Sequence, residues 1–178
     1  AVAASTRQAL GDSSVVIVAT GYADAVPALR SLGSLEDKVV IDITNPLAAD
    51  FMSLTVGHET SAAEEIAKAV PGAEVVKAFN TLFAQVLADG PTFADGQVAP
   101  VFVASDSERA KETAKVLIES IGFKPVDAGG LRNARYLEPL AGLNIYLGYG
   151  AGLGTSIAPA WRQRVCSQRP RRAPLQVS

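Results

Sequence analysis

The sequence contains few of the residues on which metal, redox and nucleophilic sites depend. Its 178 residues include one cysteine, Cys166, and one histidine, His58. A single cysteine forms no intramolecular disulfide and offers no second thiolate to a metal cluster. The sequence also has no Ser-His-Asp order, nucleophile elbow or P-loop. Hydrolytic, kinase and metal-centred chemistry therefore have no support. His58 lies in a "VGHET" loop, where we favour a solvated side chain over a general base.

Long hydrophobic segments are absent as well. No run approaches the 18 apolar residues of a transmembrane helix, and the alanine-rich start lacks the basic region and apolar stretch of a signal peptide. The hydrophobic content of 48% is normal for a globular protein, and the length suits one buried core. We therefore expect a cytoplasmic protein that is not bound to a membrane.

The charged residues are distributed unevenly along the chain. Five of the 16 basic residues lie between Arg162 and Arg172, so residues 1–161 have 11 basic residues against 18 acidic ones. An acidic body argues against nucleic acid as a partner, because phosphate contacts need clustered Lys and Arg. The tail at 162–178 could be a nucleic-acid or membrane arm, but it has two prolines and no apolar periodicity. We interpret it as a disordered tail.

A glycine-rich stretch, "GYGAGLG" at 148–154, resembles a loop that binds a dinucleotide pyrophosphate. That loop requires G-x-G-x-x-G between a strand and a helix, with backbone N–H groups facing the phosphates. In this stretch the sixth position is Leu153 or Thr155, depending on the register, and no strand precedes it. We expect these glycines to allow close helix packing or to end a helix.

Short β-branched runs alternate with helical patterns along most of the chain. The helical pattern at 61–70 opens with a capping box of Ser61 and Glu64, and the one at 107–122 has Ser105 and Glu108 as a possible cap. This alternation predicts an α/β fold with a parallel sheet flanked by helices. The expected strands are 14–20, 38–44, 74–81, 99–105 and 124–130.

The segment 131–153 is predicted to be one long helix with apolar or small residues on most sides. Such a helix needs a second surface to cover it. We expect a homodimer with this helix at the interface and with Gly142, Gly148 and Gly152 at close approaches between chains. The alternative is that its own domain buries the helix, and that the glycines relieve crowding there.

Polar residues follow the expected strands at the points where the strands end. In an open parallel sheet, ligands bind beyond these carboxyl ends. Thr20 offers a hydroxyl and Asn45 an amide, while Asp42, inside a strand, could simply bond a neighbouring backbone group. Similar residues after four strands favour a shared site, with Asn45 and Asn80 facing one cleft.

Three segments together carry a family resemblance. They are "DKVVIDITNPL", "VVKAFNT" and "KPVDAGGLRNARYLEPLAGLNIYLGYGAGLG". In this order and spacing they resemble the NADP oxidoreductases related to coenzyme F-420-dependent NADP reductase, over residues 13–161. The resemblance implies a Rossmann-type sheet, the cofactor NADP, possible use of coenzyme F-420, and hydride transfer to a deazaflavin-like or other small-molecule acceptor. In such chemistry the protein mainly aligns two rings, so no residue is assigned as catalytic acid or base and no metal is expected.

The resemblance also implies which residues would contact the cofactor. Beyond one strand, Thr20, Gly21 and Tyr22 would flank it. Near the nicotinamide would lie Asn45 and Pro46. The acceptor side would be lined by Phe79, Asn80 and Thr81. Backbone contacts to the second ring would come from Gly129, Gly130 and Leu131.

The sequence departs from this family at its start. Family members open with a strand, a G-x-G-x-x-G turn and a second strand that reads the ribose, and this sequence contains none of them. It is therefore either part of a longer member or a shortened, N-terminally truncated one. We divide it into a partial NADP-binding domain (1–130), a C-terminal helical segment (131–161) and the tail. The alternative function is a non-catalytic α/β scaffold that has lost cofactor binding.

Overall fold

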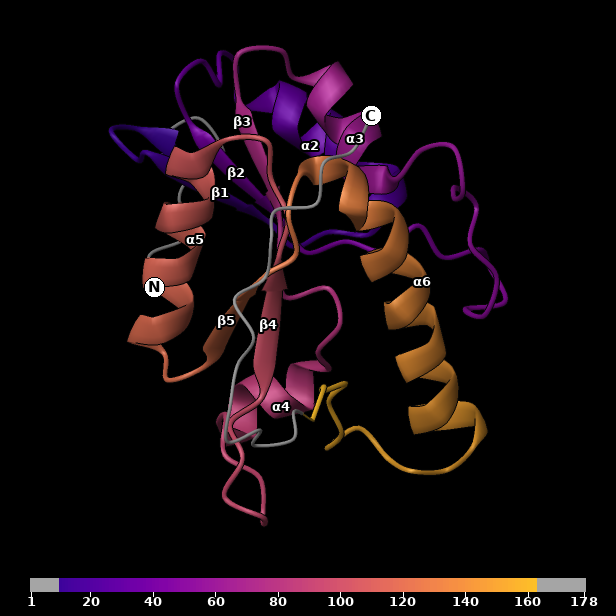
Figure 1. Cartoon of the computed structure of the whole chain (residues 1–178). Helices are drawn as coiled ribbons and strands as arrows, with labels where there is room; N and C mark the ends of the chain where they lie inside the picture. The colour runs from indigo at the N-terminus through magenta and orange to yellow at the C-terminus, as the bar shows by residue number, and fades with distance from the viewer. Residues whose placement is uncertain (1–9, 163–178) are drawn as a thin grey trace, which may run out of the picture.

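The structure, a computed structural model, describes residues 10–162. Apart from Arg162, the tail for which we predicted disorder lies outside these residues. The described strands are β1 (Val15–Val18), β2 (Val39–Asp42), β3 (Glu74–Lys77), β4 (Pro100–Val103) and β5 (Lys124–Asp127). The α-helices are α2 (Tyr22–Ser31), α3 (Ala62–Ala69), α4 (Ala84–Asp89), α5 (Glu108–Ser120) and α6 (Ala134–Ile145). The expected alternation of strands and helices is thus confirmed (Figure 1).

The strands form two parallel sheets that meet at one point. The first has the order β1-β2-β3 and the second pairs β4 with β5. A single antiparallel bridge between Lys77 and Ala104 joins them. In the first sheet Asp42 lies directly opposite Lys77, so two opposite charges face each other at the ends of β2 and β3.

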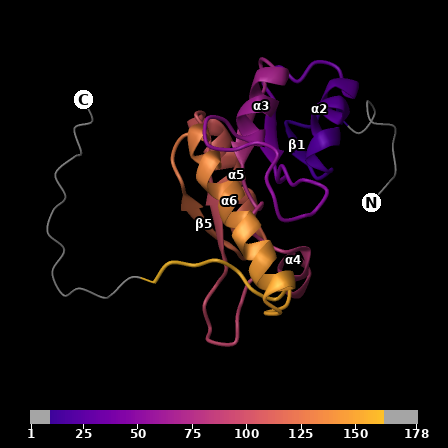
Figure 2. The ribbon, with the colours of Figure 1, turned by 90° about the vertical axis from the view of Figure 1, so that its right-hand side faces the viewer.

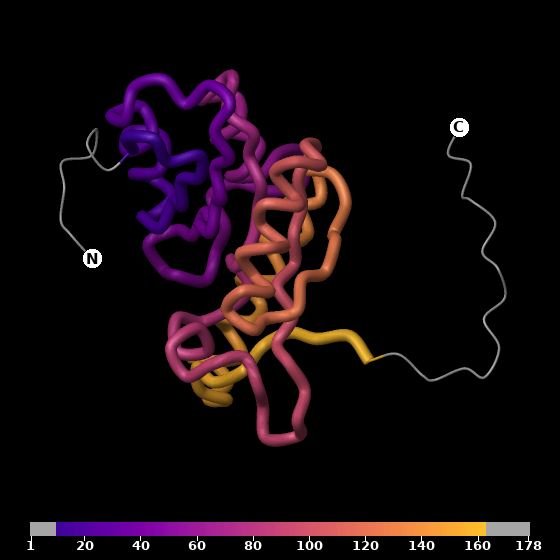
Figure 3. Tube along the Cα trace, turned by 90° about the vertical axis from the view of Figure 1, so that its left-hand side faces the viewer, coloured from indigo at the N-terminus to yellow at the C-terminus, as the bar shows by residue number. Residues whose placement is uncertain are grey.

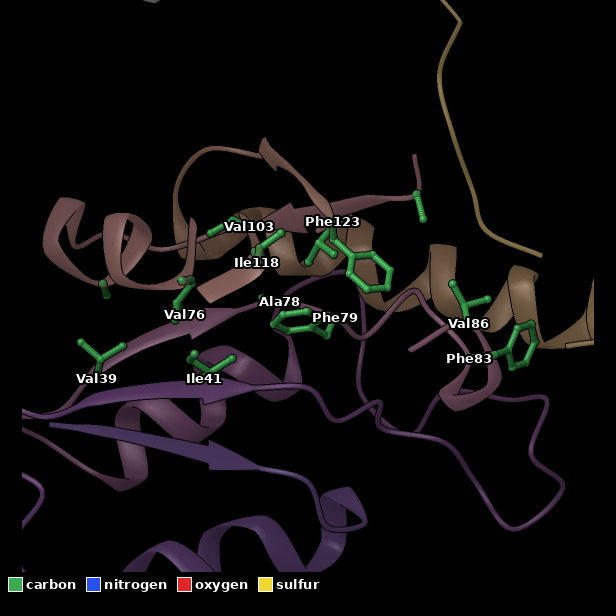
Figure 4. Packing of buried hydrophobic residues seen from close by; sticks show 14 residues of the cluster. Val39, Ile41, Val76, Ala78, Phe79, Phe83, Val86, Val103, Ile118 and Phe123 are labelled. Atoms are coloured by element: carbon green, nitrogen blue, oxygen red, sulfur yellow. The ribbon is translucent and has the colours of Figure 1, made fainter. Parts of the chain in front are cut away.

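Alternating side chains on the strands build a core on each face of the sheet. Val39 and Ile41 of β2 point to the same side as Val76 of β3, where they pack with Ala114 and Ile118 of α5. Figure 4 shows this cluster from close by. The intervening strand residues pack on the opposite side against α2 and α3. The helices therefore cover both faces of the first sheet, as a parallel sheet requires.

Serine side chains cap two of the helices. Ser61 accepts a hydrogen bond from the Glu64 N–H at the start of α3, as predicted. The prediction for α5 was wrong in detail, because the cap is Ser107, which accepts from the Ala110 N–H. Ser105 instead donates its hydroxyl to the Val75 carbonyl, so it links β4 to β3 rather than capping the helix.

The helix predicted over 131–153 changes its helical type twice along its length and ends at Gly150. It consists of the 3₁₀ turn η1 (Leu131–Asn133), α6, and the π-helical turn η2 (Tyr146–Gly150). A Cβ atom on Gly148 would lie 2.5 Å from the Phe83 ring, so this glycine lets α6 pack on its own domain. The predicted role of Gly148 in a contact between chains is therefore wrong.

The chain reverses direction after η2. Figure 2 shows α6 running along the molecule and the following segment turning back beneath it. This segment contains Trp161, whose ring makes an edge contact with Phe102 of β4 at a centroid distance of 5.1 Å.

The hairpin between α4 and β4 projects from the body of the molecule (Figure 3) and is closed by a bridge between Thr92 and Val98. No helix within residues 10–162 is long and apolar enough to cross a membrane.

Candidate active site

Two asparagines at neighbouring strand ends contact each other. The Asn80 side-chain amide donates to the Asn45 side-chain oxygen at 3.0 Å, and the Asn45 amide donates to the Asn80 carbonyl at 2.9 Å. Parallel strands bring their carboxyl ends to one edge of a sheet, which explains how residues 35 positions apart meet. The structure brings Asn45 and Asn80 together at one cleft, and their contact with a cofactor stays a prediction.

The backbone at the end of β3 is held in an unfavourable conformation. Phe79 has a φ of 62°, in the left-handed region that non-glycine residues seldom occupy. Such a conformation costs about 1–2 kcal/mol. It directs the chain away from the strand, and the next residue, Asn80, also donates to the Leu137 carbonyl of α6 at 3.0 Å. The Asn80 amide is therefore fixed from both β2 and α6.

A cleft of about 690 Å³ opens beside this asparagine pair. Its floor comes from the ends of β2 and β3, one wall from α6 and η2, and its rim from the loop after β2. The lining residues are Asn45, Leu47, Asp50, Phe51, Met52, Asn80, Thr81, Leu82, Phe83, Ala84, Ala141, Asn144, Ile145, Tyr149 and Gly150. This volume is within the range of small-molecule sites in proteins.

Two buried oxygen atoms of cleft-lining residues have no hydrogen-bond partner within residues 10–162. They are Oδ1 of Asn80 and Oγ1 of Thr81, in residues that are only 5% and 2% exposed. The Thr81 carbonyl, in contrast, accepts from the Asn144 side chain at 3.1 Å. Buried polar atoms are seldom left unpaired, because each costs roughly 1–3 kcal/mol. Both atoms are shielded from solvent by neighbouring atoms, so a molecule in the cleft reaches them only when the lining side chains shift.

A small hairpin forms the rim of the cleft. Leu47 and Leu54 are bridged in antiparallel fashion, and the tip between them carries Asp50, Phe51 and Met52. Phe51 has a φ of 56° and is 69% exposed. Exposed aromatic side chains on a loop beside a cleft offer surface that a ligand can cover.

A buried ionic network lies at the same end of the sheet. The Lys77 ammonium is 2.8 Å from Asp42 Oδ2 and 2.9 Å from Glu138 Oε1, and all three side chains are at most 1% exposed. Lys77 also donates to the Thr44 carbonyl at 2.5 Å. One ammonium therefore lies between two buried acidic side chains, so the network has a single cation for two carboxyl groups.

Glu138 links this network to two helices. Its carboxylate accepts from the N–H groups of Ala62 and Ala63 at 2.9 and 3.2 Å, at the N-terminus of α3, where the helix dipole favours a negative charge. Its neighbour on α6, Leu137, provides the carbonyl that holds Asn80. The network thus sets the position of α6, and with it one side of the cleft.

The residues after β1 lie outside the cleft lining. Thr20 donates its hydroxyl to the Gly21 carbonyl, Gly21 is the N-cap of α2, and Tyr22 is the first helical residue. Burial, and then the nearby charges of Glu65 and Glu138, raise the pKa of the Tyr22 phenol above its ordinary value. Tyr22 is therefore close to the ionic network at the carboxyl end of the sheet.

Gly129, Gly130 and Leu131 do not reach the cleft either. The Gly129 N–H donates to Asp127, and the Leu131 N–H donates to Asp106 at 2.9 Å. The loop is thus held by its own neighbours, and the structure does not bring these residues to Asn45 and Asn80. Pro46 belongs to the loop leaving β2 but does not line the cleft, whereas Thr81 does.

Sequence reasoning missed several lining residues and the whole ionic network. Phe83, Asn144 and Tyr149 come from helical segments whose orientation the sequence does not specify. The sequence did contain an indication of the rim hairpin. The connection between β2 and α3 is longer than most loops of compact domains, and long loops are often functional. The network also had a signal, since Asp42 and Lys77 are charged residues that directly follow two buried apolar residues at the ends of β2 and β3.

Comparisons with known proteins agree with this fold and its sequence motifs. The coenzyme F-420-dependent NADP reductase of Methanothermobacter marburgensis is 35% identical over 132 residues, which is 67% of this chain and 57% of that protein. Metalloreductase STEAP3 of Rattus norvegicus is 32% identical over 135 residues, or 75% of this chain and 26% of that protein. No family model matches the sequence.

A solved structure matches over most of the fold. A protein from Arthrobacter sp. FB24, described as a candidate F-420-dependent NADP reductase, has a TM-score of 0.81 and 30% identity, covering 90% of this chain and 74% of that one. The fold is thus a Rossmann-type α/β fold of the kind found in NADP reductases. The chain belongs to the NADP oxidoreductase family related to coenzyme F-420-dependent NADP reductase. The match spans 57% of the length of the Methanothermobacter marburgensis reductase and 26% of the length of STEAP3.

Proposed function

We propose that this chain is an NADP(H)-dependent oxidoreductase that transfers hydride between the nicotinamide and a deazaflavin-like or other small-molecule acceptor in the cleft. The observation that carries the proposal is the cleft at the carboxyl ends of β2 and β3, lined by the asparagine pair Asn45 and Asn80 and by Thr81. Family membership supports the choice of cofactor.

The residues that line the cleft are suited to holding rings. NADPH supplies a hydride when bound, and the acceptor takes this hydride together with a proton. No histidine, cysteine or lysine is among the described lining residues, and in this proposal the proton is taken from solvent at the open mouth of the cleft. In this proposal Asn45 and Pro46 lie near the nicotinamide, while Phe79, Asn80 and Thr81 form the acceptor side. These residues orient two rings and exclude water, which is the main contribution a protein makes to hydride transfer.

The residues after β1 complete the proposed cofactor site. Gly21 and Tyr22 begin α2 at the same end of the sheet as Asn45. We place the remainder of NADP(H) along this end, beside Thr20, Gly21 and Tyr22. Backbone contacts from Gly129, Gly130 and Leu131 to the second ring stay a prediction, although the N–H groups of Gly129 and Leu131 already donate to Asp127 and Asp106.

Cofactor binding is tested by titrating the full chain with NADPH and following its melting temperature. A ligand at one hundred times its dissociation constant adds about 2.7 kcal/mol to the free energy of unfolding. We expect a clear rise with NADPH. The absence of any shift with millimolar NADPH, NADP or NADH would instead favour the non-catalytic scaffold.

A matched pair of substitutions tests the role of the cleft. Thr81→Val and Thr44→Val each remove a buried hydroxyl that has no protein partner, but only Thr81 lines the cleft. With a deazaflavin acceptor, Thr81→Val should lower kcat/KM for NADPH oxidation by about 2- to 12-fold, the value of one hydrogen bond. Thr44→Val should leave it unchanged. Equal effects of the two variants would contradict the assignment.

We also propose that the chain forms a homodimer through the outer face of α6. Tyr136, Leu143 and Tyr146 lie at helical spacing on this face and are 75%, 54% and 47% exposed. Light scattering at tens of micromolar tests this proposal. A monomer at that concentration would contradict it.

A further inference from the structure

The buried ionic network is connected to both asparagines of the cleft, although none of its residues lines the cleft. Lys77 lies between Asp42 and Glu138, and all three side chains are at most 1% exposed. A buried ion network is weak evidence for stability, because taking charges out of water can cost as much as their attraction returns. Its connections to neighbouring groups therefore indicate what else the network does.

The first connection runs through the peptide that precedes Asn45. The Lys77 ammonium donates to the Thr44 carbonyl at 2.5 Å, and Asp42 Oδ1 accepts from the Thr44 N–H at 2.8 Å. The network thus binds both backbone groups of Thr44, which lies just beyond the end of β2. Fixing this residue fixes the backbone from which the Asn45 side chain extends.

The second connection runs through α6 to Asn80. The Glu138 carboxylate binds the Lys77 ammonium and two N–H groups at the start of α3, so it is held between a strand and a helix. The peptide on its N-terminal side contains the Leu137 carbonyl, which accepts from the Asn80 amide at 3.0 Å. The same amide donates to Asn45. A shift of Glu138 would therefore move an acceptor that holds the asparagine pair.

We propose that Lys77 and Glu138 are positioning residues, and that their network holds Asn45 and Asn80 in the arrangement that aligns the two rings for hydride transfer. This inference rests on the proposed function, since it names what orients the asparagines of the same cleft. Each positioning residue acts through the groups that it binds, and neither contacts the rings. Small displacements matter in such a site, because a shift of about 1 Å can slow a reaction by roughly 100-fold.

Glu138→Gln tests the proposal with little change in volume. It leaves one carboxyl group for one ammonium, so no buried charge loses its counter-charge. One amide oxygen replaces two carboxylate oxygens that bind three donors, so at least one of these contacts is weakened. Asp42→Asn makes the corresponding change on the other side, where Lys77 and the Thr44 N–H bind different carboxylate oxygens.

NMR spectra of the isotopically labelled full chain provide the first measurement. The side-chain amide signals of the two asparagines can be assigned from their loss in Asn45→Asp and Asn80→Asp. We expect Glu138→Gln to speed solvent exchange of the Asn80 amide by about 2- to 12-fold, the equivalent of one weakened hydrogen bond. Asp42→Asn should act mainly on the Asn45 amide. Backbone amides of β4 and β5 should keep their exchange rates, whereas a general loss of stability would speed them too.

Steady-state kinetics with NADPH and a deazaflavin acceptor provide the second measurement, taken well below the melting temperature of each variant. We expect Glu138→Gln to lower kcat by about 10- to 100-fold, because the two rings are no longer aligned. The value of kcat/KM should fall by the same factor and KM should stay unchanged, as for an interaction that acts only in the transition state.

Glu74→Gln provides the matched control. Glu74 is the first residue of β3 and accepts from the Arg109 guanidinium at 2.9 and 2.7 Å, so the substitution removes a carboxylate from an ion pair at the opposite end of the strand from Lys77. Glu74 is not among the residues that line the cleft. Its substitution should leave both asparagine signals and kcat unchanged.

The outcomes separate this inference from the proposed function. The inference is overturned if both network variants leave the asparagine exchange rates unchanged, if exchange quickens while kcat keeps its wild-type value, or if Glu74→Gln has the same effects. Should Glu138→Gln fail to fold, Asp42→Asn is used for both measurements. A wild-type chain that oxidises no NADPH with the deazaflavin refutes the proposed function, and the exchange rates then still decide whether the network holds the asparagine pair.

Discussion

Replacing Lys77 by methionine should be among the most destabilising single changes in this chain. The substitution keeps most of the side-chain volume but removes the ammonium that lies 2.8 and 2.9 Å from Asp42 and Glu138. Two carboxylates would then remain buried without a cation. Breaking a buried ion pair in this way costs about 3–5 kcal/mol. That is a large part of the 5–15 kcal/mol by which proteins of this kind are typically stable.

The expected loss can be read from thermal and urea unfolding. At about 2–4 °C per kcal/mol for a chain of this size, the melting temperature should fall by roughly 6–20 °C. The control is Lys68→Met, which removes a lysine from an exposed pair with Glu65, with side chains 68% and 38% exposed. That variant should lose no more than about 0.5 kcal/mol.

A second substitution tests the cause of the loss. Adding Asp42→Asn to Lys77→Met removes one of the two unpaired charges and should recover part of the stability, which a double-mutant cycle measures as coupling. If Lys77→Met and Lys68→Met had similar small effects, the buried network would not hold the fold together. If Asp42→Asn made the Lys77 variant still less stable, unpaired charge would not be the cause.

Three further changes should have measurable effects. Gly148→Ala should destabilise the protein by about 1–3 kcal/mol in urea unfolding, because its Cβ would collide with the Phe83 ring, and a neutral result would refute this packing. The melting temperature should fall as the pH drops below about 4.5, because hydrogen bonds from Arg135 lower the pKa of Glu64 below its ordinary value. The stability that the Glu64 carboxylate contributes is present above pH 4.5 and is lost as the pH falls through the pKa of the folded state. Glu64→Gln should flatten this dependence, and an unchanged slope would exclude the pair as its source. Ile17→Lys should reduce association beyond the proposed dimer in light scattering and change stability by less than about 0.5 kcal/mol, because Ile17 is 51% exposed on β1 at the edge of its sheet; unchanged scattering would show that this edge does not associate.

The fold was largely predictable because strands and helices leave periodic patterns. The runs Val15–Val18 and Val39–Asp42 are rich in β-branched residues, the second run is fully buried, and the capping box at Ser61 marks where α3 begins. The interruption at η2 was not predictable, since it depends on the Phe83 ring lying against Gly148. A contact between distant segments leaves no local periodic signal.

The site was predictable only where topology alone brings residues together. Asn45 and Asn80 follow adjacent parallel strands, so their meeting follows from strand order. Gly129 follows β5 in the second sheet, and the position of that sheet is set by packing that the sequence does not reveal. The partnership of Glu138 with Lys77 depends on how α6 is rotated against the strands, which the sequence likewise left open.

The contact between Trp161 and Phe102 gives the protein a built-in optical probe. Trp161 is the single tryptophan of the sequence, and its ring lies against β4, in the second of the two sheets. Its emission therefore reports on that half of the molecule, whereas far-ultraviolet circular dichroism averages over the whole. Within residues 10–162 the sheets are joined by the Lys77–Ala104 bridge, by the hydrogen bond from Ser105 to Val75 and by a shared apolar core, so how cooperatively they unfold can be measured. Coincident melting curves would show one unfolding unit, and an earlier tryptophan transition would show that the β4–β5 half opens first.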